Sequence, residues 1–191
     1  AAMNTGTGWI GSLINFSGGS GYWIIVEEDL SFSYIINSGL GRTAINEYVE
    51  ILPHGSAFKV RQSDKQAFYF VDQVELLDGA IENGDWLISY NGSVITGVRQ
   101  WQGVVIDIPA MGYSENDANT SGYFVEGNTP TFKLLKNTTG ELLQLGGEVD
   151  EWASNGVFTI SRLVEIEPVP EEFGLNSAYP NPFNPVTTLS F

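Results

Sequence analysis

The sequence predicts an all-β protein built from antiparallel β-sandwich modules, and three observations support this prediction. Short segments rich in Ile, Val, Phe, Tyr, Trp and Thr recur along the 191 residues, and most of the 22 glycines lie between them. Only residues 43–52 have a pattern compatible with a helix, and the β-branched residues there, followed by Pro53, favour a strand or irregular structure. Because each sheet must bury one face, several short strands separated by turns favour two sheets packed together.

The first predicted strands lie in the N-terminal part of the chain. The apolar run at residues 22–26 is expected to form a strand buried on both faces, and the alternating segment at residues 31–35 is expected to pair with it. The acidic residues 27–29 would form the turn between them. One hairpin and a lone segment before it are too little for a core, so residues 1–40 are expected to be the end of an N-terminally truncated β module.

The clearest local prediction is a hairpin in the middle of the chain. Residues 86–90 and 93–98 are two apolar segments that flank the dipeptide Asn91-Gly92. Asn-Gly tolerates the two positive φ angles of a type I′ turn better than other dipeptides do. The spacing therefore predicts two antiparallel strands joined by a tight turn.

Further strands are predicted towards the C-terminus. Residues 131–135 and 141–145 are expected to form a second hairpin, because Asn, Thr and Gly residues between them favour a turn. Residues 157–161 are the last predicted strand of this region. Residues 41–166 are therefore expected to form one β-sandwich module.

The composition excludes several classes of function. The chain has 8 Lys and Arg against 23 Asp and Glu, a net charge of −15, no cysteine and one histidine, His54. Disulfides, thiolate metal sites and cysteine nucleophiles are therefore excluded, and most catalytic triads and histidine metal sites are disfavoured. So acidic a surface repels nucleic acid and anionic lipid, and suits cations better. The apolar runs are also far shorter than the roughly 20 residues that span a bilayer.

The composition changes sharply after residue 166. Residues 167–172 read Glu-Pro-Val-Pro-Glu-Glu, and proline lacks the donor that a central strand needs, while the like charges extend the chain. This segment is expected to be an acidic, proline-rich linker. Residues 173–191 then begin with turn signals and end in a strand-like alternation, which predicts the start of another, truncated domain.

A distinctive motif opens that last segment, and it consists of Tyr179, Pro180, Asn181, Pro182, Phe183, Asn184 and Pro185. It resembles the opening of the C-terminal sorting domain carried by cargo of the type IX (Por) secretion system, and the preceding linker and Phe173-Gly174-Leu175 fit the usual approach to that motif. The resemblance implies a small Ig-like β-sandwich that is recognised at the outer membrane. The chain ends at Phe191, so most of that sandwich is expected to be missing. The implied location is extracellular or on the outer cell surface.

The body of the chain has a weaker resemblance to modules of such secreted proteins. Residues 19–26 resemble a strand found near the end of one β-rich module. Segments within residues 66–112 resemble a second module that often precedes the sorting domain. Neither module implies an assigned activity.

One loop has the spacing of a calcium ligand set. Asp117, Asn119 and Ser121 place oxygen side chains at alternate positions, and the carbonyl of Tyr123 would be a fourth ligand. The glutamate expected at the twelfth position is replaced by Asn128. Because calcium takes six to eight oxygens, the alternative is a polar loop with Asx-turns and no ion.

The five tryptophans raise the possibility of carbohydrate binding, because flat aromatic rings pack on sugar rings. Trp9 and Trp152 lie among polar and acidic neighbours and are predicted to be surface residues that contact a glycan. Trp23, Trp86 and Trp101 lie within apolar segments and are predicted to fill the core.

No catalytic arrangement is visible in the sequence, so the protein is predicted not to be an enzyme. The favoured function is a secreted or cell-surface structural or adhesive module, exported by a type IX-like route, which could assemble with further copies through a strand ending at Phe191. A carbohydrate- or calcium-binding module is the alternative, and a fragment of a glycan-active enzyme the third. The expected partners are the secretion machinery through the C-terminal region, and either further copies or a polysaccharide; nucleic acid is not expected.

Overall fold

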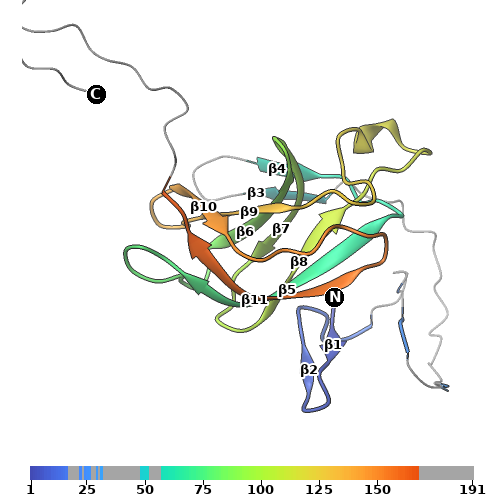
Figure 1. The fold of residues 1–191 in the computed structure, drawn as a ribbon, viewed down its shortest axis with the longest axis horizontal. Coiled ribbons are helices and arrows are strands. Elements are labelled where there is room, and N and C mark those ends of the chain that lie inside the picture. The colour runs from blue at the N-terminus through green and yellow to red at the C-terminus, as the bar shows by residue number, and fades with distance from the viewer. Residues whose placement is uncertain are drawn as a thin grey trace, which may run out of the picture.

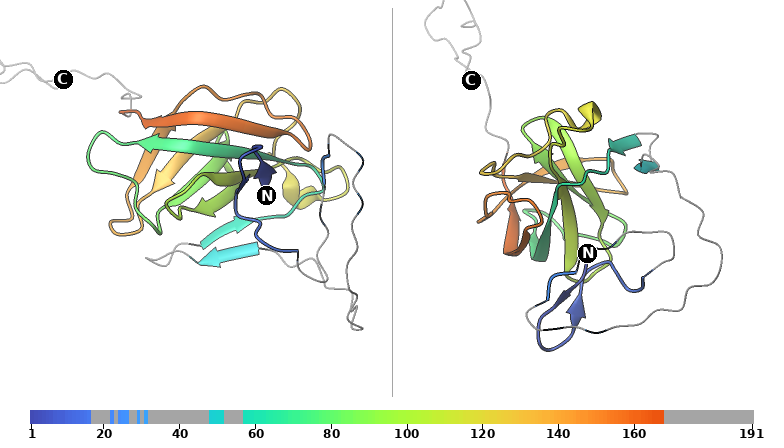
Figure 2. Two further views of the ribbon diagram at one scale, coloured as in Figure 1. Left: turned by 90° about the horizontal axis from the view of Figure 1, so that it is seen from below. Right: turned by 90° about the vertical axis from the view of Figure 1, so that its right-hand side faces the viewer.

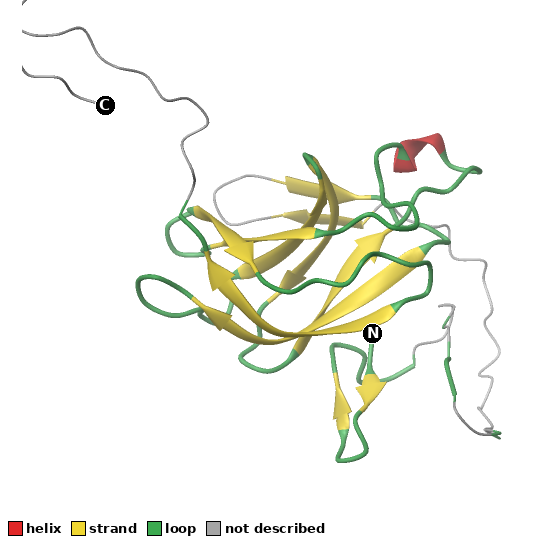
Figure 3. Cartoon of the chain, in the orientation of Figure 1, coloured by secondary structure: helices red, strands yellow, loops and turns green. Residues whose placement is uncertain are grey.

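The computed structural model describes residues 1–16, 22, 24–26, 29, 31, 48–51 and 57–167, and for residues 48–51 and 57 the backbone only. Strands dominate this part of the chain, and its one helix is a short 3₁₀ turn, η1 (Figure 3). The all-β prediction is confirmed. The elements are β1 (Met3–Asn4), β2 (Trp9–Ile10), β3 (Tyr48–Ile51), β4 (Ala57–Val60), β5 (Gln66–Glu75), β6 (Trp86–Asn91), β7 (Val94–Gln100), β8 (Ile106–Met111), η1 (Ala118–Thr120), β9 (Thr131–Leu135), β10 (Leu142–Gly146) and β11 (Val157–Glu165).

Seven strands form one large sheet in the order β7-β6-β9-β10-β11-β5-β8 (Figure 1). Two small hairpins, β1–β2 and β3–β4, accompany it. The pairs in the large sheet are antiparallel except β5–β11, which is parallel. The prediction of antiparallel pairing throughout is therefore wrong for this one pair. It was missed because local patterns do not reveal which distant segments become neighbours.

The two end strands of this sheet, β7 and β8, curl round until they meet. At Gly97 in β7, a Cβ atom would lie only 1.8 Å from the carbonyl oxygen of Pro109 in β8, so only glycine fits there. Two side chains bridge the seam: Ser89 Oγ donates to the Pro109 carbonyl at 2.7 Å, and Arg99 Nε donates to the Asp107 carbonyl at 2.8 Å. Proline has no N–H to leave unpaired, and its carbonyl is bonded, so the edge of β8 is protected.

The core lies inside the curled sheet. Its fully buried side chains include Tyr69, whose ring stacks on Phe158 at 4.9 Å between centroids and meets Phe132 edge-on at 5.6 Å. A second cluster on the other face of β6 and β7 packs against Phe58 of β4. The predicted core positions of Trp86 (4 % exposed) and Trp101 (8 % exposed) are confirmed. Trp23 lies outside the described residues.

The predicted hairpins at β6–β7 and β9–β10 are confirmed, with one change in the first turn. Asn91 pairs with Val94, so the two-residue loop is Gly92-Ser93 rather than Asn91-Gly92. The φ angle of Gly92 is 59°, and Ser93 is not among the residues with positive φ. This turn needs glycine at its first central position only, as in type II′ turns.

The predicted strand at residues 22–26 is wrong for the part that the structure describes. Ile24, Ile25 and Val26 form no strand and are 45 %, 73 % and 51 % exposed. An apolar run is buried as a strand only where a neighbouring strand and a second layer cover it, and the described residues supply neither here. Of the predicted partner segment 31–35 the structure describes Ser31 alone, which is exposed, and the linker after Glu167 and the sorting motif lie outside the described residues.

The seam makes Gly97 a sensitive position. We expect Gly97→Ala to lower the free energy of unfolding by about 1–3 kcal/mol or more, because the added methyl group overlaps the Pro109 carbonyl. Urea denaturation at pH 7 measures this. Gly8→Ala is the matched control, since a Cβ at Gly8 meets nothing within 4 Å. Equal stabilities of the two variants would show that the seam is not closely packed.

Candidate functional site

The loop predicted to bind calcium lies between β8 and β9 and contains η1. Asp117 caps η1: its Oδ1 accepts from the backbone N–H and the side-chain amide of Asn119, at 3.0 and 2.8 Å. Its Oδ2 accepts from Arg61 Nε at 2.8 Å. The hydrogen bonds from Arg61 and Asn119 lower the pKa of this carboxyl. Both carboxylate oxygens therefore already have protein donors.

The other predicted ligand residues also take part in hydrogen bonds within the protein. The Tyr123 hydroxyl accepts from the Arg61 backbone N–H at 2.8 Å, and its carbonyl accepts from Asn91 Nδ2 at 3.3 Å. Ser121 closes η1 through its backbone N–H. Within the described ranges, no three His, Cys, Asp or Glu side chains are grouped so as to hold a metal ion. The loop has the Asx-turn of the alternative prediction, in which Asp117 accepts from the Asn119 N–H, and calcium binding stays a prediction.

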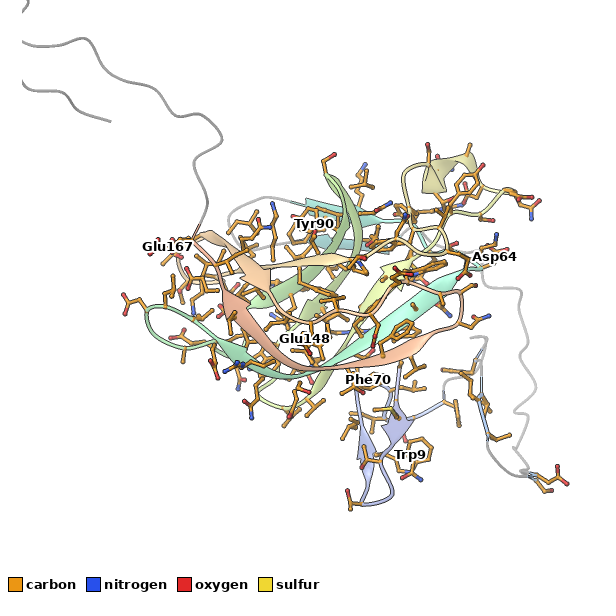
Figure 4. All side chains as sticks on the ribbon, viewed as in Figure 1. Trp9, Asp64, Phe70, Tyr90, Glu148 and Glu167 are labelled. Carbon is orange, nitrogen blue, oxygen red and sulfur yellow. The ribbon has the colours of Figure 1, made fainter. Side chains whose placement is uncertain are left out.

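The two tryptophans predicted to contact a glycan lie in very different surroundings. Trp9 is 74 % exposed on the β1–β2 hairpin (Figure 4). Trp152 is 2 % exposed, its Nε1 donates to the Ala110 carbonyl at 2.9 Å, and its ring stacks on Phe124. The predicted surface position of Trp152 is therefore wrong, because its polar sequence neighbours gave no sign of this buried acceptor and ring. The two rings do not form one platform for a sugar.

Two buried carboxylates were not singled out from the sequence. Asp85 is fully buried and accepts from Lys136 Nζ at 2.9 Å, from the Glu82 N–H at 2.9 Å and from the Asn137 N–H at 2.8 Å. It thereby ties the turn before β6 to the turn after β9. The nearby Gly84 is the only local sequence signal, and it indicates a turn rather than a buried charge.

Asp107 has the same role at another junction. It is fully buried on β8 and accepts from Ser12 Oγ at 3.0 Å, from Arg99 at 2.9 Å, and from the Ser12 N–H. These bonds fasten the β1–β2 hairpin to the large sheet, beside which Figure 2 shows it. Next to them, Gly11 lies against the Phe70 ring.

A groove lies where β10 and β11 separate. Its volume is about 610 Å³, and it is lined by Gly146, Gly147, Glu148, Val149, Asp150, Thr159, Ser161, Arg162 and Val164. One wall is β11 and the other is the segment that leaves β10, on which Figure 4 labels Glu148. The strand that forms the β11 wall was predicted from the sequence, but the groove was not, because it results from the divergence of two strands.

No family model, curated protein or solved structure matches this chain. The part of the chain that the structure describes contains no helix with the length and apolar character needed to cross a lipid bilayer.

Substitution of Asp85 tests whether these buried carboxylates stabilise the fold. We expect Asp85→Ala to cost about 3–5 kcal/mol of unfolding free energy, because it leaves the Lys136 ammonium without its counterion and two N–H groups without their acceptor. Urea denaturation monitored by tryptophan fluorescence measures the loss. Asp78→Ala, at an exposed position in the same connection, should change stability by less than about 0.5 kcal/mol. A loss of similar size in both variants would contradict the role given to Asp85.

Proposed function

We propose that the protein is a secreted or cell-surface module with a structural or adhesive role, exported by a type IX-like route. The motif at residues 179–185 supports the export, and it rests on the sequence because these residues lie outside the described ranges. The acidic, proline-rich linker at residues 167–172 fits a tether between the body and such a signal.

The way the described charged groups are used supports a non-catalytic role. Asp85 and Asp107 are buried, and each joins segments that are far apart in the sequence. A catalytic carboxylate must instead reach a substrate with a free oxygen. We therefore assign these two groups to rigidity, which suits a module that presents a fixed surface.

The charge distribution supports an adhesive surface that favours cationic partners. Among the residues that the structure describes, four basic side chains pair with carboxylates, namely Arg61 with Asp117, Arg99 with Asp107, Lys136 with Asp85 and Arg162 with Glu75. These pairs neutralise positive charge, and most of the acidic side chains in the described ranges have no ion-pair partner there. Such a surface attracts cationic groups and repels nucleic acid.

The export proposal is tested in cells that carry a type IX translocon and produce the protein from its uncut reading frame. We expect Asn181→Ala combined with Phe183→Ala to reduce the amount on the cell surface and in the medium by at least tenfold. Quantitative immunoblotting of cell fractions measures this. Asn176→Ala, in the same tail but before the motif, is the control. Unchanged export of the double variant would refute the proposed route.

A further inference from the structure

The junction between β10 and β11 has the fewest residue pairs of any two neighbouring strands in the large sheet. Only two residue pairs join these strands, Leu145 with Glu165 and Gly146 with Val164. On its other side β11 pairs with β5 from Val157 to Val164. One long side of β11 therefore has a neighbouring strand, and the opposite side has one only at its C-terminal end.

The backbone N–H and C=O groups of alternate β11 residues point to the side of β11 where β10 does not pair with it. The Phe68 N–H donates to the Gly156 carbonyl at 3.0 Å, which sets the phase of the parallel ladder between β5 and β11. In such a ladder alternate residues bond the same neighbour, so Val157 and Thr159 direct their N–H and C=O groups away from β5. Among the described residues no strand pairs with them on that side. This is an open strand edge of the kind that accepts another strand.

The groove of about 610 Å³ lies along this open edge. Its narrow end is at Gly147, where a Cβ atom would lie 2.7 Å from the Arg162 carbonyl oxygen. Beyond that point the segment of residues 147–150 leaves β11, and Thr159 and Ser161 are exposed.

We propose that the open edge of β11 binds an extended, positively charged peptide segment of another protein by strand addition. Main-chain hydrogen bonds to Val157 and Thr159 would hold the peptide, and alternate side chains would set its specificity. This inference goes beyond export, because the groove is formed by the folded body alone.

The charges of the groove favour a cationic partner. Glu148 and Asp150 line it, and neither carboxylate has an ion-pair partner among the described residues. The one basic residue in the lining, Arg162, pairs with Glu75 at 3.3 Å. A second copy of this chain, with its net charge of −15, would be repelled, and the strand-like residues 186–191 contain no basic group. Charge complementarity therefore selects a Lys- or Arg-containing strand.

The test is fluorescence anisotropy of the purified full chain with a labelled six-residue peptide that alternates Lys and Val. We expect saturable binding, and at least a tenfold loss of affinity when the amides of the peptide on one edge are N-methylated. The same peptide with Glu in place of Lys should bind at least tenfold more weakly. Equal binding of the N-methylated peptide would overturn the proposal, because charge alone would then account for the affinity.

Variants of the groove locate the binding. We expect Glu148→Lys combined with Asp150→Lys to lower the affinity for the cationic peptide at least tenfold. Glu141→Lys, at an exposed turn outside the groove, should have little effect on this affinity. Circular dichroism checks that all variants fold. Equal weakening by both changes would overturn the proposal.

Two further outcomes identify other occupants, and each would also overturn the proposal. In the first, an uncharged peptide with the sequence of residues 186–191 displaces the labelled peptide as strongly as the unlabelled cationic peptide does. In the second, the protein self-associates in sedimentation experiments, and the cationic peptide reverses this self-association. All these measurements use purified protein and do not depend on export. A negative binding result would therefore not affect the export proposal, and a negative export result would not affect the binding proposal.

Discussion

The fold depends on the closure of one curled sheet where β7 meets β8. The two strands approach too closely for any residue but glycine at position 97, and side chains replace the backbone ladder there. The closure encloses the core, so the inward rings of Tyr69 and Phe132 are covered without a second large sheet. It also gives the edge of β8 partners within the chain and so protects it from addition of another strand.

This closed seam contrasts with the junction between β10 and β11. At the seam, the carbonyls of Asp107 and Pro109 are occupied by Arg99 and Ser89. At the junction, no strand among the described residues pairs with β11 at Val157 and Thr159, and the groove beside them is lined by Glu148 and Asp150. One edge is therefore protected and another is left open in the same sheet, and this difference is the physical basis for assigning partner binding to β11.

The sequence predicted the local elements better than their arrangement. Alternating apolar residues and turn residues are local signals, so the hairpins β6–β7 and β9–β10 and the strand β11 could be predicted. The parallel pairing of β5 with β11 joins segments far apart in the chain, and no local pattern encodes it. The same limit explains Trp152, whose burial depends on Ala110 and Phe124, about forty and thirty positions earlier. The groove could not be predicted at all, because it exists only where two paired strands diverge.

Amide hydrogen exchange of the free protein tests the open edge of β11 most directly. If β11 has no neighbour beyond Gly146 on the side of the groove, the Thr159 amide should exchange much faster than those of Phe158 and Ile160, which point to β5. Equal and strong protection of all three amides would mean that the edge is already paired, and would contradict this account of the molecule.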